Sequence, residues 1–362
     1  MRRKQFLQQL LPAGIGLGMA PSLLASPFST DPPVSKPAGP NPPYLKPGDL
    51  VAITCPASPV ERKDVLSSQQ IIRQLGFNCC IGHTVGKQWE RFGGTDIERA
   101  TDLQLLLEDP SVKAVLFGRG GYGVMRMMDK VNWDALARNP KWLIGYSDIT
   151  AIHCHVNSTL GIPTLHGTMA GTMNSADAPA ARSLWQALQG KPIQYMAPSY
   201  GLNRKGVGTG MLVGGNLSLI AATMGSVSEI QTDGRLLLIE DVSEYKYTID
   251  RMLMTLKRAG KLNNLAGLIV GGFTATKADS EMNYPSTVEE IILEKVQDYK
   301  YPVCFRFPAG HIANNMALKL GMHYNLYVTA TGSQLSEVQD PHPTLPLPTA
   351  LPDSLLKAPS GL

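Results

Sequence analysis

Short apolar runs alternate with longer amphipathic segments through the first half of the chain. Three of these runs predict buried strands, at 50–54, 114–117 and 142–144. Apolar positions at helical spacing predict helices over 65–75 and 95–107, and a capping box of Thr95 and Glu98 begins the second. Strands that alternate with helices are typical of a parallel sheet covered by helices. The pattern therefore predicts an α/β domain over 45–180.

The alternation resumes after a less apolar connection at 181–205 and a glycine-rich segment at 206–215. Further strands are predicted at 235–239, 266–270, 302–305, 316–320 and 325–330. Helices are predicted at 216–224, 248–259 and 286–299. Ser286 and Glu289, just after Pro285, have the spacing of a capping box for the last helix. We expect these elements to form a second α/β domain over 206–335.

The two ends of the chain differ from this body. Residues 1–25 begin with Arg2, Arg3 and Lys4 and continue into an apolar stretch, which is typical of an export signal, with a twin-arginine-like pattern. An apolar N-terminal helix that stays attached is the alternative. We expect a Pro/Ser-rich linker at 26–44, a Pro-rich tail at 336–362 and a periplasmic location. No other apolar run reaches the roughly 18 residues of a membrane span.

Composition and charge narrow the classes of function. Hydrophobic residues make up 43% of the 362 and charged residues 17%, which excludes a disordered chain. Setting aside the three basic residues of the predicted signal leaves 30 basic and 29 acidic residues, so nucleic acid is not an expected partner. The five cysteines are scattered, without the spacing of a zinc site or a disulfide framework. We therefore predict no metal.

A serine stands where the strand at 142–144 gives way to a helix. The segment Gly145-Tyr146-Ser147-Asp148 would place the Ser147 hydroxyl above the carboxyl edge of a parallel sheet, at a helix N-terminus. The N–H of Asp148 would then point at a developing oxyanion. The alternative is that Ser147 and Asp148 only cap the helix. Ile149 occupies the position of the second glycine of an esterase elbow, which favours the alternative.

Other candidate residues are ambiguous by themselves. The segment from Gly118 to Gly123 fits a dinucleotide fingerprint, an oxyanion-binding turn or an ordinary tight turn. His311 lies in a loop rich in Gly and Pro, where functional residues are often found. Glu240 and Asp241 end an apolar strand, and such carboxylates more often cap a strand than catalyse a reaction.

Several separated motifs, taken together in chain order, carry a family resemblance. They are Phe92-Gly93-Gly94-Thr95-Asp96, Arg99-Ala100, Asp102-Leu103, Arg119-Gly120-Gly121-Tyr122-Gly123, Gly145-Tyr146-Ser147-Asp148, Gly214-Gly215-Asn216-Leu217, Leu238-Ile239-Glu240-Asp241 and Gly310-His311. Over about residues 46–332 the chain resembles the LD-carboxypeptidase family of serine peptidases. That family includes muramoyltetrapeptide carboxypeptidase and immunity peptidases that cleave a peptide–nucleotide antibiotic.

The resemblance implies a fold and a set of roles. It implies a flavodoxin-like N-terminal domain and a mixed α/β C-terminal domain. It implies a triad in which Ser147 is the nucleophile, His311 the general base and acid, and Glu240 the group that orients the imidazole. The oxyanion would be held by the N–H groups of Asp148 and Gly121. Arg119 is a candidate for binding the terminal carboxylate of the substrate, and it could equally brace the glycine turn; no cofactor is implied.

The implied reaction releases the terminal D-alanine from a murein tetrapeptide or muropeptide, at the L,D bond after the diamino acid. One alternative is an immunity-type peptidase that cleaves a modified or nucleotide-linked peptide. Another is an exported muropeptide-binding protein without catalysis, and a dehydrogenase would require nicotinamide binding. A homodimer is common in the family, although these residues do not predict it. Many relatives lack a signal, so the predicted export is a departure that leaves the physiological substrate open.

Overall fold

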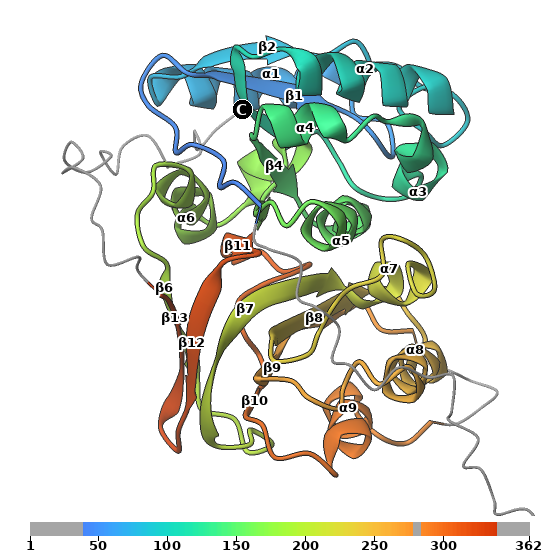
Figure 1. Ribbon diagram of the computed structural model, residues 1–362, viewed down its shortest axis with the longest axis vertical. Coiled ribbons are helices and arrows are strands. Elements are labelled where there is room, and N and C mark those ends of the chain that lie inside the picture. The colour runs from blue at the N-terminus through green and yellow to red at the C-terminus, as the bar shows by residue number, and fades with distance from the viewer. Residues whose placement is uncertain (1–38, 278–283, 339–362) are drawn as a thin grey trace, which may run out of the picture. The chain divides into compact units, whose positions relative to one another are not determined.

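The computed structural model describes residues 39–277 and 284–338, which form two β-sheets with helices packed on them (Figure 1). The predicted export signal at 1–25 and nearly all of the predicted tail at 336–362 lie outside the described residues. Within the described ranges, no helix is long and apolar enough to cross a membrane.

Every helix and strand predicted from the pattern is present within a few residues of its expected bounds. The first sheet contains β1 (Leu50–Thr54), β2 (Asn78–Ile81), β3 (Val112–Phe117), β4 (Trp142–Gly145), β5 (Thr164–His166) and β11 (Leu318–Leu320). The second sheet contains β6 (Gln194–Pro198), β7 (Gly206–Asn216), β8 (Leu236–Val242), β9 (Gly267–Thr274), β10 (Val303–Cys304), β12 (His323–Val328) and β13 (Gly332–Glu337). The helices are α1 (Arg62–Gln74), α2 (Asp96–Glu108), α3 (Val124–Met127), α4 (Asp134–Arg138), α5 (Thr150–Thr159), α6 (Ala178–Leu188), α7 (Leu217–Ala222), α8 (Lys246–Arg258) and α9 (Val288–Val296).

The first sheet has the strand order β11-β5-β4-β3-β1-β2. Its strands are parallel except β11, which pairs antiparallel with β5. Without β11 this is the 2-1-3-4-5 order of flavodoxin-like folds, as predicted for the N-terminal domain. The run at 316–320, expected in the second domain, instead extends the first sheet. Its Leu318 and Leu320 are fully buried in the same core as Leu165 of β5.

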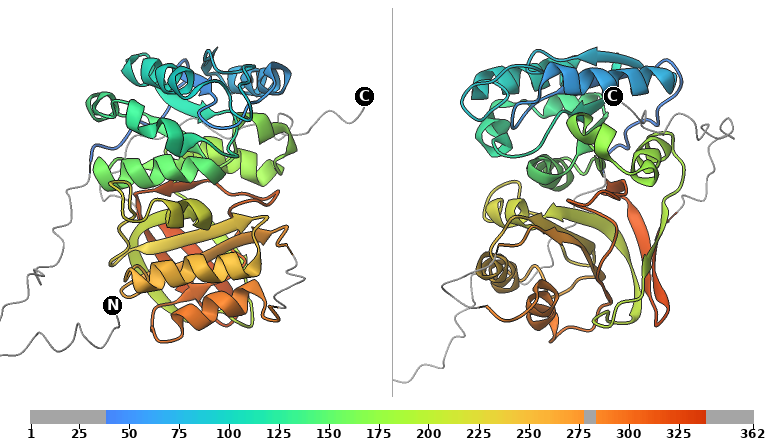
Figure 2. Two further views of the ribbon diagram at one scale, coloured as in Figure 1. Left: turned by 90° about the vertical axis from the view of Figure 1, so that its right-hand side faces the viewer. Right: turned by 180° about the vertical axis from the view of Figure 1, so that it is seen from behind.

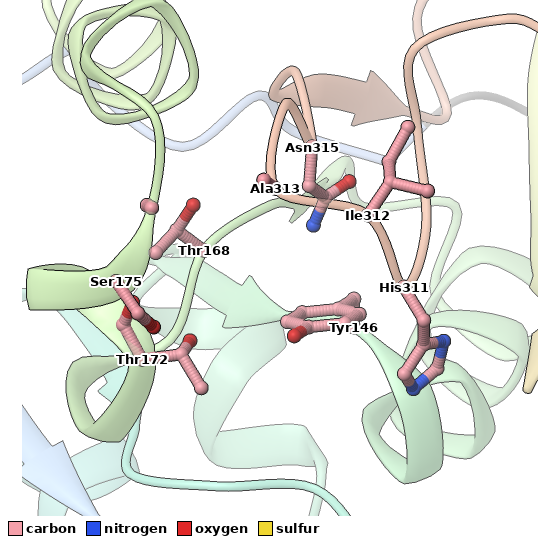
Figure 3. Close-up of a pocket in the computed structure, with 9 residues that line it drawn as sticks. Tyr146, Thr168, Thr172, Ser175, His311, Ile312, Ala313 and Asn315 are labelled. Atoms are coloured by element: carbon pink, nitrogen blue, oxygen red, sulfur yellow. The ribbon is translucent and has the colours of Figure 1, made fainter. Parts of the chain in front are cut away.

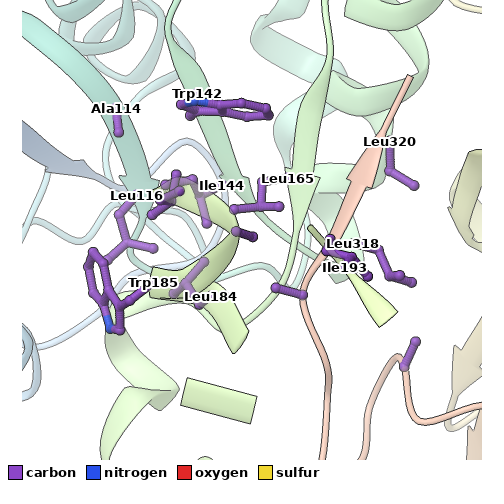
Figure 4. Close-up of a cluster of buried hydrophobic side chains, with 14 of the residues drawn as sticks. Ala114, Leu116, Trp142, Ile144, Leu165, Leu184, Trp185, Ile193, Leu318 and Leu320 are labelled. Atoms are coloured by element: carbon purple, nitrogen blue, oxygen red, sulfur yellow. The ribbon is translucent and has the colours of Figure 1, made fainter. Parts of the chain in front are cut away.

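Side chains of the first sheet alternate between two hydrophobic cores, as expected for strands covered on both faces. In β4, Trp142 and Ile144 share a core with residues of α1 and α6, whereas Leu143 lies in a core with α2 and α5. Figure 4 shows Ile144 between Trp142 and Leu184 of α6. The carboxyl ends of β3 and β4 are thereby held in a fixed position at one edge of the sheet.

Two local expectations are corrected. The segment 181–205, expected as a connection, contains most of α6 and the edge strand β6, because the apolar face of α6 packs against the first sheet. The capping box expected at Ser286 and Glu289 lies one residue later, and α9 begins at Val288. The hydroxyl of Thr287 accepts from the N–H of Glu290 at 3.2 Å, and the Glu290 carboxylate accepts from the N–H of Thr287 at 2.8 Å. The capping box of Thr95 and Glu98 is confirmed.

The second sheet is mixed, as predicted. Its order is β10-β9-β8-β7-β12-β13-β6, with parallel pairs up to β7 and antiparallel pairs beyond it. Leu236 and Leu238 of β8 reach the core shared with the first sheet, whereas Leu237 and Ile239 pack with α8 and α9. Helix α5 contacts both β7 and α7, so the helix that follows Ser147 lies against the second sheet (Figure 2).

Candidate active site

Ser147 occupies a strained turn between β4 and α5. Its φ angle is 65°, in the left-handed region that residues other than glycine rarely adopt, and residues 147–149 form one turn of 3-10 helix before α5 begins. A serine in a strained strand-to-helix turn is the arrangement of a nucleophile elbow. Neither Ser147 nor Asp148 caps α5 through its side chain. The capping role considered for these two residues is therefore not observed.

The glycine turn after β3 lies directly against Ser147. A Cβ atom on Gly120 would stand 2.8 Å from the Ser147 Cβ and 3.1 Å from its Oγ, so only glycine fits there without displacing the serine. The buried Asp148 carboxylate accepts from the N–H of Val124 at 2.8 Å, which joins the serine turn to the end of the glycine turn. Because α3 has only four residues, this arrangement favours a turn that serves the serine over a dinucleotide fingerprint.

Ser58 holds the glycine turn from the other side, and the sequence offered no signal for it. Its N–H donates to the carbonyl of Gly120 at 3.1 Å, and its hydroxyl accepts from the N–H of Tyr122 at 3.3 Å. Two bonds from one loop residue fix the direction of the peptide groups around Gly121. The predicted oxyanion donor Gly121 thus belongs to a turn whose backbone is held in place before any ligand arrives.

Glu240 and His311 form a hydrogen-bonded pair at the end of β8. The Glu240 carboxylate is fully buried, and its Oε2 accepts from His311 Nδ1 at 2.6 Å and from the His311 N–H at 3.2 Å. A carboxylate acceptor places the hydrogen on Nδ1 and leaves Nε2 as the free nitrogen of a neutral imidazole. This is the geometry of a base whose tautomer is held by an acid.

A β-bulge makes room for this pair. The register between β8 and β9 shifts between Ile239 and Asp241, opposite a glycine-containing stretch of β9. The loop that carries His311 joins β9 there through a bridge between Gly272 and Gly310. Gly310 has φ 102°, and a Cβ atom on it would stand 2.6 Å from Glu240 Oε2. The bulge and this glycine together bring the histidine loop onto the carboxylate.

Tyr146 connects the two halves of the site. Its ring centroid lies 5.0 Å from that of His311, and Ser147 is the next residue along the chain. Within the described residues, no hydrogen bond joins the Ser147 hydroxyl to His311. In structures without a bound substrate such catalytic bonds are often long and form only in the complex. The structure thus brings the three predicted triad residues into one region and pairs two of them directly.

Asp241, beside Glu240 on β8, has a different environment. Its carboxylate accepts from Asn216 Nδ2 at 2.9 Å, from the N–H and hydroxyl of Ser218, and from the N–H of Val242. Burial raises the pKa of Asp241 to about 6. The N–H of Asn216 in turn donates to Thr150 Oγ1 at 3.0 Å, at the start of α5. This chain of bonds ties the serine turn to the strand that carries Glu240.

Two cavities adjoin the site and share Thr172. The first has a volume of about 290 Å³ and is lined by Tyr146, His311, Asn315 and neighbouring residues (Figure 3). The second, of about 410 Å³, is lined by Arg119 among others. Arg119 is exposed, and its guanidinium forms no ion pair with a described residue.

Two histidines beneath the site are held neutral. His153 Nε2 lies 2.9 Å from the carbonyl of Gly145, and His166 Nε2 lies 3.1 Å from Asn315 Oδ1. Burial lowers the pKa of His153 to about 4 and that of His166 to about 3. Both therefore act as fixed donors in the scaffold rather than as bases. In the part of the chain that the structure describes, no group of three or more His, Cys, Asp or Glu side chains could hold a metal ion.

Two family models match the chain. The LD-carboxypeptidase N-terminal domain matches residues 51–167, and the LD-carboxypeptidase C-terminal domain matches residues 209–326. A probable murein peptide carboxypeptidase of Bacillus subtilis is 33% identical over 289 residues, which cover 77% of this chain and 89% of that protein. Ser147, Glu240 and His311 lie within the two matched ranges.

Solved structures with similar folds agree with these matches. The crystal structure of muramoyltetrapeptide carboxypeptidase from Oxalobacter formigenes has a TM-score of 0.74 at 25% identity, covering 81% of this chain and all of that one. The microcin C7 self-immunity protein, in complex with aspartyl sulfamoyl adenosine, has a TM-score of 0.73 at 20% identity and covers 83% and 98%. The second similarity is one of fold.

Proposed function

The chain belongs to the LD-carboxypeptidase family of serine peptidases, and we propose that it releases the terminal D-alanine of murein tetrapeptides through Ser147, His311 and Glu240. Family membership makes the chain a peptide hydrolase, which argues against a binding protein without catalysis. The observation that carries the proposed triad is the 2.6 Å bond from His311 Nδ1 to the buried Glu240 carboxylate.

The chemistry follows from that bond. His311 Nε2 takes the proton of the Ser147 hydroxyl as its oxygen attacks the carbonyl carbon of the scissile amide. The imidazolium that forms is stabilised by Glu240, and it then gives the proton to the nitrogen of the leaving D-alanine as the amide bond breaks. Water, activated by the same imidazole, cleaves the resulting ester and restores the serine. In this second step the imidazole takes a proton from the water and returns it to the Ser147 oxygen as the tripeptide is released with its new carboxyl group.

The negative charge on the tetrahedral oxygen needs donors that are already oriented. We assign this role to the N–H groups of Asp148 and Gly121. The bonds of Ser58 to the glycine turn and of the Asp148 carboxylate to Val124 support that assignment, because they hold both backbone segments in place. One such donor typically contributes about 3–4 kcal/mol of transition-state stabilisation.

Arg119 is assigned to substrate binding. Its exposed guanidinium lines the cavity that shares Thr172 with the site and has no ion-pair partner among the described residues. The peptide L-Ala-D-Glu-mDAP-D-Ala carries carboxylates besides the terminal one, and a free guanidinium attracts such groups. The predicted export would make peptides outside the cytoplasm the substrate pool.

A specific observation also supports an immunity-type peptidase as a second candidate. A cavity of about 490 Å³ shares Ile312 with the smaller cavity at His311, and it has room for a group larger than an amino acid. The solved structure of the microcin C7 self-immunity protein has the same fold. In this reading the same triad would cleave an amide of a modified or nucleotide-linked peptide.

The test is incubation of the purified full chain with L-Ala-D-Glu-mDAP-D-Ala, followed by mass spectrometry. We expect the tripeptide and free D-alanine, with no release from a matched peptide that ends in L-alanine. An intact tetrapeptide together with cleavage of an aspartyl sulfamoyl nucleoside would favour the second candidate. Stability of both would contradict the proposed function.

A further inference from the structure

The cavity of about 290 Å³ beside His311 contains two hydrogen-bond donors without acceptors. Asn315 is 4% exposed, and its Oδ1 accepts from the N–H of Gly310 at 2.7 Å and from His166 at 3.1 Å. The backbone N–H can only donate, so it fixes which end of the amide is oxygen. Among the described residues, Asn315 Nδ2 has no hydrogen-bond partner. Figure 3 shows this nitrogen facing the side of the cavity where Tyr146 lies.

The second donor is the hydroxyl of Thr168. This residue is 3% exposed, lines the same cavity and forms no hydrogen bond with any described residue. The other two aliphatic hydroxyls of the cavity already donate to backbone carbonyls, Thr172 to Met169 at 3.3 Å and Ser175 to Thr172 at 3.0 Å. A buried donor without an acceptor is costly, so Asn315 Nδ2 is poised for a group that only accepts, and the Thr168 hydroxyl can donate to the same group.

The described lining of the cavity carries no negative charge that would repel a carboxylate as that group. Its described lining contains no acidic side chain, and His311 is its only ionisable base. A volume of about 290 Å³ lies at the lower end of the range of ligand pockets, which is roughly 300–1,000 Å³. A small residue that ends in a carboxylate fits both properties, whereas a nucleotide is too large for this volume.

The position of the cavity relative to His311 selects one end of the substrate. In the proposed function His311 returns its proton to the leaving nitrogen, so the leaving residue must lie against the imidazole. We propose that this cavity binds the departing D-alanine, and that Asn315 Nδ2 and the Thr168 hydroxyl hold its terminal carboxylate. The inference rests on the proposed function and leaves Arg119, in the neighbouring cavity, for a different carboxylate of the peptide.

The sharpest test is Asn315→Asp. Aspartate keeps the Oδ1 acceptor for Gly310 and His166 but replaces the Nδ2 donor with an anionic oxygen. We expect kcat/KM for the tetrapeptide to fall by about 100-fold, while a peptide ending in D-alaninamide, which can donate to the aspartate, loses little. Thr168→Val should lower cleavage of the acid by about 10-fold and spare the amide. Asn314→Asp, a matched change one residue away and outside the cavity lining, should keep the wild-type ratio of acid to amide.

Equal losses for acid and amide in Asn315→Asp would reduce Asn315 to a scaffold residue and overturn the inference. The inference also fails if Arg119→Gln, rather than Asn315→Asp, removes the preference for the acid. Affinities of both peptides for Ser147→Ala, with and without Asn315→Asp, provide a readout that needs no turnover. If the wild type cleaves neither peptide, the proposed function fails, and the affinity ratio alone still decides whether the cavity binds the carboxylate.

Discussion

Glu240 and Asp241 are neighbours on one strand, both are buried, and their environments are opposite. Asp241 accepts four hydrogen bonds, from Asn216, Ser218 and Val242, and so every part of its carboxylate is engaged by the scaffold. Within residues 39–277 and 284–338, Glu240 accepts only from His311, and its Oε1 has no partner. A carboxylate whose oxygens all accept hydrogen bonds from the scaffold stabilises the fold. A carboxylate whose hydrogen bonds come only from a histidine can instead stabilise the positive charge of the imidazolium.

The largest expected effect comes from Glu240→Gln. The neutral amide cannot stabilise the imidazolium and no longer dictates the tautomer of His311, so we expect kcat/KM for D-alanine release to fall by about 10⁴-fold. Circular dichroism and Tm should stay close to wild type. The matched change at the next residue, Asp241→Asn, should cost no more than about 10-fold in kcat/KM, because Asp241 acts only through Asn216 and Thr150. Similar losses in the two variants would erase the distinction between the carboxylates.

An intermediate effect is expected from Gly310→Ala. The added methyl group would stand 2.6 Å from Glu240 Oε2, at a φ of 102° that alanine rarely adopts, so the histidine loop must move away from the carboxylate. We expect a loss of about 100-fold in kcat/KM. Gly225→Ala is the control, because Gly225 also has a positive φ (77°) but nothing lies within 4 Å of its added Cβ. Full activity in Gly310→Ala would show that the contact with Glu240 is not needed.

The smallest effect concerns stability and pH. Burial raises the pKa of Asp241 from 3.8 to about 6, so its contribution to stability is fully present below about pH 4 and is lost as pH rises through 6. Subtracting the free energy of unfolding of Asp241→Asn from that of wild type gives the pH-dependent contribution of the Asp241 carboxyl group to stability. The difference should fall by about 2 kcal/mol between pH 4 and pH 7, measured by urea denaturation. A difference that rises over this range would mean that the four hydrogen bonds outweigh burial.

Much of the site could be predicted because its signals are local. The strand before Ser147, the apolar run before Glu240 and the Gly-Pro loop around His311 are each visible within about ten residues. The family motifs then joined these segments, and the structure pairs two of them directly. The capping box at Thr95 is equally local, since donor and acceptor are three residues apart.

Other features depend on contacts between segments far apart in the chain, and no local sequence pattern predicts them. The glycines of β7 show no alternation of apolar and polar side chains, so the sequence of 206–215 did not predict a strand. The segment is a strand because it pairs with β8 and β12. Strand β11 joins the first sheet by pairing with β5, about 150 residues earlier. The role of Asn315 depends in the same way on His166, 149 residues away. A single asparagine in a loop belongs to no periodic pattern, so the sequence does not predict its contact with a distant residue.

The most direct measurement compares D-alanine release from L-Ala-D-Glu-mDAP-D-Ala by wild type and by Ser147→Ala, with Tm recorded for both. If Ser147 is the nucleophile that His311 and Glu240 activate, kcat/KM should fall by roughly 10⁵–10⁶-fold at unchanged Tm. Turnover by Ser147→Ala within about 10-fold of wild type would remove Ser147 from the reaction. It would also leave the pair of Glu240 and His311 to be explained as part of the scaffold.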